Sequence, residues 1–160
     1  MKEINTGTSA LIFQDIDELS TVDKNLMEAA IQAAKNAYAP YSGFSVGAAL
    51  LMEDNSIITG NNQENAAYPS GMCAERVAIW KAGSSYPNIK VKKIAISAFS
   101  SNKKLNKPVG PCGACRQTLL EYEINQKEVM EIFFMGEIGN VVKTNSIASL
   151  LPFSFDSSYL

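Results

Sequence analysis

Predicted strands alternate with predicted helices along most of this chain, and several of the strands are apolar on both faces. "VKKIAISAFS" at 91–100 and "EVMEIFFMGE" at 128–137 are the clearest examples. Successive side chains of a strand point to opposite faces, so a strand of this kind has to be covered on both sides. The sequence therefore predicts an α/β fold, a three-layer α/β/α sandwich.

Five strands and three helices are expected in this fold. The predicted strands occupy residues 44–52, 57–60, 91–100, 128–137 and 140–144. The predicted helices occupy residues 21–39, 73–83 and 112–123. Thr21 is a plausible cap for the first helix, and Gly83 is a plausible stop for the second. Residues 1–20 show no clear period, so we expect an N-terminal extension followed by one domain over residues 21–160.

Composition and charge exclude several classes of protein. The chain has 160 residues, of which 46% are apolar, and this suffices for one domain with a real core. A net charge of −2 gives no basic surface for nucleic acid. No apolar run approaches the roughly 18 residues that span a bilayer. The first residues, "MKEINTGTSALIFQDIDELS", mix acids and amides into the apolar positions, unlike a signal peptide. We expect a cytoplasmic protein.

All three cysteines occur in two short motifs, and each motif begins a predicted helix. Cys73 lies in "GMCAER", whereas Cys112 and Cys115 lie in "PCGACRQ". On a helix, residues three apart can point the same way. Helix N-termini favour the thiolate, which is the form that binds zinc. Free cysteines are also common as buried apolar residues, and a lone CxxC motif also occurs in redox proteins, but neither of these explanations requires all three cysteines.

The two motifs together predict a catalytic zinc site. Two converging helices would offer three sulfur ligands and leave the fourth position of a tetrahedral ion open, whereas structural sites usually have four protein ligands. The chain contains no histidine, so no other soft ligand is available. We predict that one zinc ion is bound by Cys73, Cys112 and Cys115.

Glu75 and Arg76 lie two and three residues after Cys73, so both could act at such a zinc site. If Cys73 is the cap residue, its backbone is not yet helical and Glu75 can also approach the metal. A carboxylate there can accept a proton from a zinc-bound water and redeliver it. Arg76, Arg116 or both could donate hydrogen bonds to the sulfurs and offset their negative charge. The alternatives are a surface glutamate favoured by the helix dipole and an ordinary exposed arginine.

The motifs resemble those of the cytidine deaminases. "CAER" followed by "PCGACRQ" is similar to the all-cysteine zinc signature of the small homotetrameric members of this family. "YAPYSGFSVGAAL", "GNNQENAAYPSGMCAER" and "LLPFSF" also resemble family segments, in the family's order. The resemblance covers roughly residues 27–155 and implies an α/β/α sandwich with a mixed five-stranded sheet. It leaves residues 1–20 unaccounted for.

The resemblance implies a reaction and a set of substrate contacts. Water on zinc attacks C4 of cytosine while Glu75 moves the protons, and the products are the uracil nucleoside and ammonia. The substrates implied are cytidine and deoxycytidine, as in pyrimidine salvage. The residues that resemble substrate-binding positions of the family are Phe44 against the nucleoside, Asn62 and Glu64 on the ribose 3′-hydroxyl, Ala74 with Glu75 on the cytosine edge, and Ala66, Tyr68 and Phe155 across subunit boundaries. The site would thus require an oligomer, and a homotetramer is expected.

Three alternative functions fit these residues less well. A blasticidin S deaminase-like enzyme would share the scaffold, but "NQEN" at 62–65 favours an intact ribose, which that antibiotic does not carry. Polynucleotide deaminases generally use histidine as one ligand and need a surface for phosphates. A zinc-stabilised binding module would be expected to lack Glu75 or to have a closed fourth ligand position. We therefore expect a nucleoside substrate, no nucleic-acid partner and no membrane.

Overall fold

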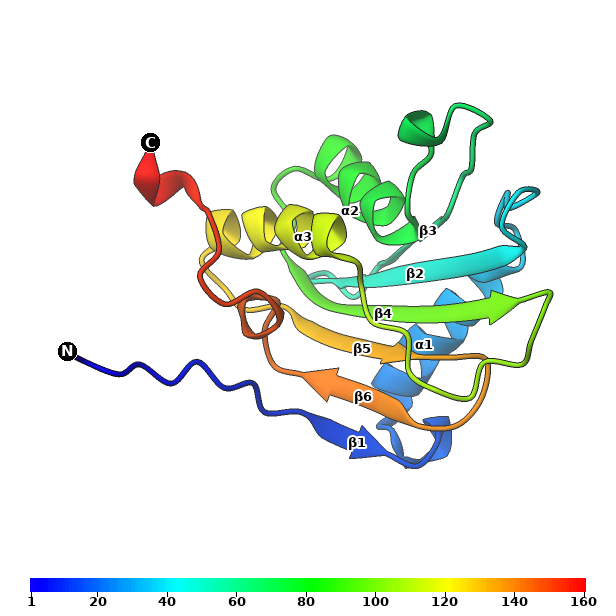
Figure 1. Cartoon of the computed structure of the whole chain (residues 1–160), viewed down its shortest axis with the longest axis horizontal. Coiled ribbons are helices and arrows are strands. Elements are labelled where there is room, and N and C mark those ends of the chain that lie inside the picture. The colour runs from blue at the N-terminus through cyan, green and yellow to red at the C-terminus, as the bar shows by residue number, and fades with distance from the viewer.

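The structure is a computed structural model that describes all of residues 1–160, and it is built on one mixed sheet of six strands (Figure 1). The strand order is β1-β6-β5-β4-β2-β3. The strands are β1 (Leu11–Phe13), β2 (Phe44–Met52), β3 (Ile57–Asn61), β4 (Val91–Ser100), β5 (Glu131–Met135) and β6 (Val141–Thr144). Only β4 and β5 pair in parallel, and every other pair is antiparallel.

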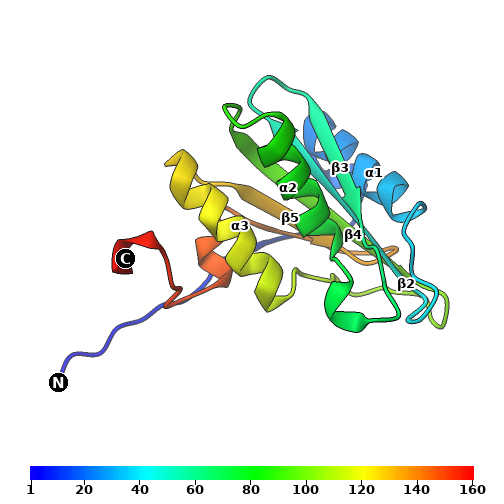
Figure 2. The ribbon, with the colours of Figure 1, turned by 90° about the horizontal axis from the view of Figure 1, so that it is seen from above.

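Three helices cover the two faces of the sheet. They are α1 (Thr21–Ala34), α2 (Ala74–Ser85) and α3 (Gly113–Gln126). Figure 2 shows α1 on one side of the sheet and α2 with α3 on the other. The predicted α/β/α sandwich is confirmed.

Alternation along the strands divides the core into two halves. Leu50 of β2 packs with the α2 and α3 side chains, whereas its neighbours Ala49 and Leu51 pack with those of α1. β5 does the same, with Ile132 on the α2–α3 side and Phe133 on the α1 side. These strands are apolar on both faces because helices lie against both.

The sixth strand was not predicted. β1 has three residues and pairs with β6, in the register Leu11 with Lys143 and Phe13 with Val141. The side chains of Leu11 and Ile12 are exposed, so no alternating apolar pattern marks this strand in the sequence. It forms because the edge of β6 offers hydrogen-bonding partners that lie far away along the chain.

Several helix boundaries differ from those predicted. α1 ends at Ala34 rather than at residue 39, and α3 continues to Gln126 rather than ending at residue 123. The cap of α1 is Ser20 rather than Thr21, and its hydroxyl accepts a hydrogen bond from the amide of Asp23 at 3.2 Å. α2 continues through Gly83 to Ser85, so Gly83 is not a stop. A side chain at Gly83 would meet Tyr122 of α3, with its Cβ only 2.5 Å from the tyrosine hydroxyl. This glycine allows the two helices to approach each other.

The topology brings the segments before α2 and α3 to one edge of the sheet. β3 and β4 both pair antiparallel with β2, so they run in the same direction and end at the same edge. The chain passes from β3 to α2 and from β4 to α3. Phe44, at the start of β2, is paired with Ser100 at that edge. No helix is long and apolar enough to cross a membrane.

Candidate active site

The three cysteines meet at this edge, where α2 and α3 begin. Cys73 is the N-cap of α2, with φ −75° and ψ 151°, and Cys112 is the N-cap of α3, with φ −68° and ψ 166°. Cys115 lies in the first turn of α3 and is buried. All three sulfurs lie within 4.8 Å of one another, and the Sγ atoms of Cys112 and Cys115 are 3.5 Å apart. None of the cysteines forms a disulfide.

The local electrostatics favour a thiolate at Cys73. A hydrogen bond from the Cys115 thiol, reinforced by Arg76, lowers the pKa of Cys73 to about 5 against the opposing effect of burial. The same contact with Cys73, together with burial, raises the pKa of the Cys115 thiol. The cluster thus holds negative charge at Cys73, in the ionisation state that metal ligation requires.

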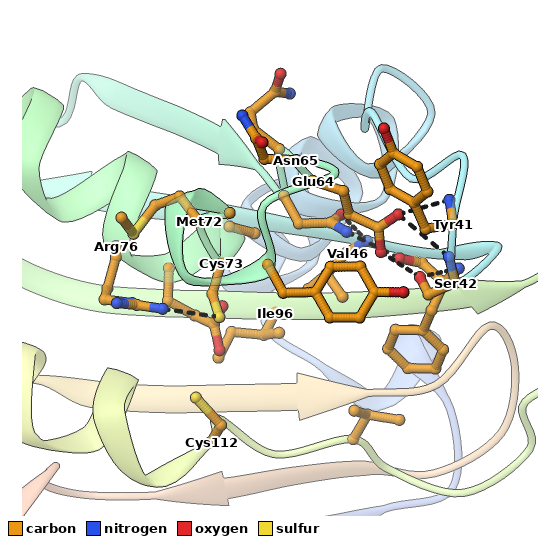
Figure 3. Close-up of a pocket in the computed structure, with 18 of the residues that line it drawn as sticks. Tyr41, Ser42, Val46, Glu64, Asn65, Met72, Cys73, Arg76, Ile96 and Cys112 are labelled. Carbon is orange, nitrogen blue, oxygen red and sulfur yellow. Dashed lines mark hydrogen bonds between the residues drawn. The ribbon is translucent and has the colours of Figure 1, made fainter.

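Arg76 contacts both the cysteine cluster and the ring of Trp80 on α2. Its Nη2 donates to the sulfur of Cys73 at 3.3 Å, as Figure 3 shows, and its guanidinium lies 5.9 Å from the ring centroid of Trp80. The hydrogen bond to Cys73 raises the pKa of Arg76. The Nε of Arg76 is buried and has no hydrogen-bond partner.

Glu75 is the acid nearest to the cluster in sequence, and only 5% of its surface is exposed. Burial raises the pKa of its carboxyl, and the negative charge of Cys73 raises it further. A raised pKa makes a carboxyl a better proton acceptor when it is ionised, which favours its use as a general acid–base.

A cavity of about 640 Å³ opens beside the cluster. Most of the predicted site residues line it, namely Phe44, Asn62, Glu64, Tyr68, Cys73, Ala74, Glu75, Arg76 and Cys112. Its size is within the usual range for small-molecule sites. The lining combines aromatic and aliphatic side chains with a few polar groups, and Figure 3 shows Cys73 and Cys112 near one end of it and Glu64 with Ser42 near the other.

The polar end of the cavity is held by two side chains from the loop after β3. Asn62 accepts from the amide of Val46 at 2.7 Å and donates to the carbonyl of Phe44 at 2.9 Å. Glu64 accepts from the amides of Tyr41 and Ser42 at 2.9 and 3.2 Å and from the Ser42 hydroxyl. The loop and the start of β2 therefore form one connected unit.

Four of the predicted residues lie outside the cavity lining. Cys115 is buried, whereas Ala66 is exposed in the loop before α2. Phe155 is 58% exposed and stacks on Tyr159, with the ring centroids 5.6 Å apart. Arg116 donates to the carbonyls of Pro111 and Leu150, at 2.9 Å each. The structure thus places its guanidinium on the loop before Cys112 and on the C-terminal segment.

Several lining residues were missed by sequence reasoning. They are Tyr41, Ser42, Val46, Gln63, Asn65, Gly71, Met72, Ile96, Val109 and Gly110. Tyr41, Ser42 and Val46 belong to the segment "YAPYSGFSVGAAL", so the motif itself was the available signal. Val109 and Gly110 come from the connection between β4 and α3, whose path depends on long-range packing.

The donor set fits zinc. Three free thiols, one of them held as a thiolate, converge in one cluster. Ligands at about 2.3 Å from a tetrahedral ion lie about 3.8 Å from one another, and the observed cluster is compatible with that spacing. An arginine beside the sulfurs opposes their charge.

Comparison with known proteins agrees with this chemistry. Residues 20–131 match the family model described as the cytidine and deoxycytidylate deaminase zinc-binding region. The chain is 42% identical over 130 residues to a cytidine deaminase of Halalkalibacterium halodurans, covering 81% of this chain and 91% of the relative. It is 34% identical over 135 residues to a cytidine deaminase of Mycobacterium tuberculosis, covering 84% and 90% respectively.

Solved structures show the same likeness. The crystal structure of a cytidine deaminase from Burkholderia pseudomallei is 37% identical, with a TM-score of 0.72, over 86% of this chain and 100% of that one. The enzyme from Mycobacterium tuberculosis gives a TM-score of 0.65 at 29% identity, over 85% and 98%. The cysteine cluster, the fold and the similarity over most of the chain agree, and the chain therefore belongs to the cytidine and deoxycytidylate deaminase family of zinc-binding hydrolytic deaminases.

Proposed function

We propose that this protein deaminates cytidine and deoxycytidine, giving uridine and deoxyuridine with release of ammonia. The observation that carries the proposal is the convergence of three cysteine sulfurs beside a buried carboxyl, at one end of a cavity of nucleoside size. The chemistry fits a role in pyrimidine salvage.

Cys73, Cys112 and Cys115 would hold one zinc ion in each chain. When bound, zinc lowers the pKa of a coordinated water to about 7 and so supplies a nucleophile at neutral pH. Arg76 offsets the charge of the sulfurs through its hydrogen bond to Cys73. Arg116 acts less directly, because its guanidinium holds the carbonyl of Pro111, the residue before Cys112.

Glu75 would move the protons. Its carboxylate accepts a proton from the attacking water and delivers it to N3 of the cytosine ring, which makes C4 more electrophilic. It then accepts the proton of the hydroxyl group added at C4 and transfers it to the amino group, so that the C4–N bond breaks, ammonia leaves and C4 becomes the carbonyl carbon of uracil. Its burial supports this role, because a raised pKa brings a carboxyl closer to the pH at which it works.

The remaining lining residues would orient the nucleoside. Phe44 lies against the substrate, and the backbone of Ala74 with Glu75 contacts the cytosine edge. Asn62 and Glu64 bind the ribose 3′-hydroxyl at the polar end of the cavity.

An oligomer would complete the site. Tyr68 is 76% exposed and Phe155 is 58% exposed, although both are large aromatic residues. We propose a cytoplasmic homotetramer in which Ala66, Tyr68 and Phe155 contact sites of neighbouring subunits. Its native mass should be four times the 17.3 kDa of the chain.

The test is an absorbance assay with cytidine, deoxycytidine and CMP, on protein purified without added metal. Turnover of both nucleosides but not of CMP is expected, because Arg76 is the only cation in the cavity lining and it is already hydrogen-bonded to Cys73, which leaves no cation for a 5′-phosphate. Turnover of CMP in preference to the nucleosides would contradict the proposed substrate class. If none of the three compounds is turned over, other amidine-containing compounds become the candidate substrates.

A further inference from the structure

The turn before β2 is fixed by a single carboxylate and a single hydroxyl. One oxygen of Glu64, Oε2, accepts from the amides of Tyr41 and Ser42. The other, Oε1, accepts from the Ser42 hydroxyl, which itself accepts from the amide of Phe44 at 3.0 Å. Because the Ser42 oxygen accepts from Phe44, its own proton is directed to Glu64.

The turn is also anchored from its other side. Gly43 has a φ of +63°, and its carbonyl accepts from the amide of Ser101 at 2.8 Å, at the end of β4. A Cβ at Gly43 would lie 2.2 Å from the Ser101 hydroxyl oxygen. The contacts between Gly43 and Ser101 therefore fix the backbone position of the adjacent Ser42.

The remaining hydrogen-bonding capacity matches one hydroxyl group. Glu64 Oε2 already accepts two hydrogen bonds, whereas Oε1 accepts one and retains a free lone pair. Asn62 donates one of its two amide protons to the carbonyl of Phe44 and retains the other. Both side chains line the cavity, so its lining includes one free donor and one free acceptor. A hydroxyl both donates and accepts, and so it can use the two together.

We propose that Ser42 is a positioning residue that determines sugar recognition, because it directs the free lone pair of Glu64 toward the substrate hydroxyl and ties that carboxylate to the backbone of Phe44. This inference rests on the proposed function, since it takes the ribose 3′-hydroxyl as the group that Asn62 and Glu64 bind. The hydrogen bond from Ser42 is also the main cause of the lowered pKa of Glu64, so this contact favours the ionised carboxylate.

The experiment compares two substrates in each variant. The value of kcat/KM is measured for cytidine and for 3′-deoxycytidine with the wild type, Ser42→Ala and Ser42→Thr. The ratio of the two values is independent of the fraction of active protein, so a partly unfolded variant still gives an answer. Ser56→Ala is the matched control, because Ser56 makes an equivalent contact with Asp54 at 2.6 Å but lies in the turn between β2 and β3, outside the cavity.

The expected result is specific to the sugar. Ser42→Ala should lower the preference for cytidine over 3′-deoxycytidine by about tenfold, as expected for a hydrogen bond to a charged group. Ser42→Thr, which retains the hydroxyl, should restore the preference, and Ser56→Ala should leave it unchanged. An equal loss on both substrates, or no loss, would overturn the inference and leave the proposed function intact. Failure of the wild type to deaminate either nucleoside would overturn both.

Discussion

At the scale of single residues, Arg76 joins the cysteine cluster to the surface of α2. It donates to Cys73, and its guanidinium lies over the ring of Trp80. Because a ring face attracts a cation, Trp80 helps to keep the guanidinium directed at the sulfur. Lysine could supply the charge at this position but neither the planar fork nor the same stacking.

The first prediction concerns the affinity for zinc. Arg76→Gln removes the charge that offsets three thiolates, so zinc affinity should fall by about 10–100-fold. Competition with a chelator at fixed pH measures this loss. Lys81→Gln, an exposed charge change on the same helix, is the control and should have no effect. Equal affinity in the wild type and Arg76→Gln would mean that the arginine does not tune the metal.

At the cysteine cluster, the local backbone could be predicted from the sequence, whereas the side-chain contacts could not. Cys73 was predicted at the start of its helix, with a backbone that is not yet helical if it is the cap, and it is the N-cap of α2 with an extended backbone. The motif could not show which arginine reaches sulfur, because Arg76 and Arg116 both follow a cysteine in their motifs. The outcome depends on the path of the chain before Cys112, where the carbonyl of Pro111 lies within reach of Arg116.

At the scale of elements, the position of α2 depends on Gly60 of β3. A Cβ at this residue would lie 2.5 Å from the amide nitrogen of Ala78 and 2.7 Å from the carbonyl oxygen of Ala74. Both atoms belong to the backbone of α2, so they cannot move away as a flexible side chain could. The close approach of strand and helix therefore sets where Cys73 and Glu75 lie.

The second prediction follows from this approach. Gly60→Ala should lower the free energy of unfolding by about 2–3 kcal/mol, because the added methyl group has no space without a shift of the helix. Denaturant unfolding measures the change. Gly113→Ala is the control for stability, because a Cβ there meets nothing within 4 Å and the residue is helical. A fully stable Gly60→Ala variant would show that α2 is not constrained at this point.

The α1 face of the sheet carries a line of ion pairs across three strands. Glu131 of β5 pairs with Lys93 of β4 at 3.1 Å and with Lys143 of β6, and Lys93 also pairs with Asp23 of α1 at 2.7 Å. Burial raises the pKa of Glu131, but the hydrogen bonds from the two lysines outweigh it and lower the pKa below the ordinary 4.5.

The third prediction is a dependence of stability on pH. A lowered pKa in the folded state means that the ion pairs contribute fully above pH 4.5 and that the contribution is lost as the pH falls through the folded pKa. Between neutral pH and acid, the wild type should therefore lose about 1 kcal/mol more stability than Glu131→Gln. Thermal or urea unfolding across this range measures the difference. Parallel losses in the two proteins would show that the pairs contribute no net stability.

At the scale of the whole molecule, the order of the core strands and helices could be predicted from the sequence, whereas the edge strand β1 could not. The core strands and all three helices carry local patterns of apolar residues, whereas β1 exists only through pairing with β6. The N-terminal extension contacts the segment after β6, where the hydroxyl of Thr8 donates to the carbonyl of Ser149. Such contacts join residues more than a hundred positions apart, and no local pattern indicates them. The division at residue 20 stays a prediction.

Whole-molecule topology also explains how a site forms from four separate stretches of sequence. The ends of β3 and β4 and the start of β2 lie at one edge, so residues 41–46, 62–65, 73–76 and 109–115 converge there. A deaminase site in this chain therefore depends on the complete sheet, and we propose that the three cysteines and Glu75 act in it as one unit.

The most direct measurement of that claim is the zinc content and the deamination rate of wild type and Glu75→Gln, purified side by side without added metal. We predict close to one zinc per chain in both proteins, and a kcat for cytidine that is at least about a thousandfold lower in the variant, because the amide cannot transfer protons. Substantial activity in Glu75→Gln, or a wild type without zinc, would contradict the account.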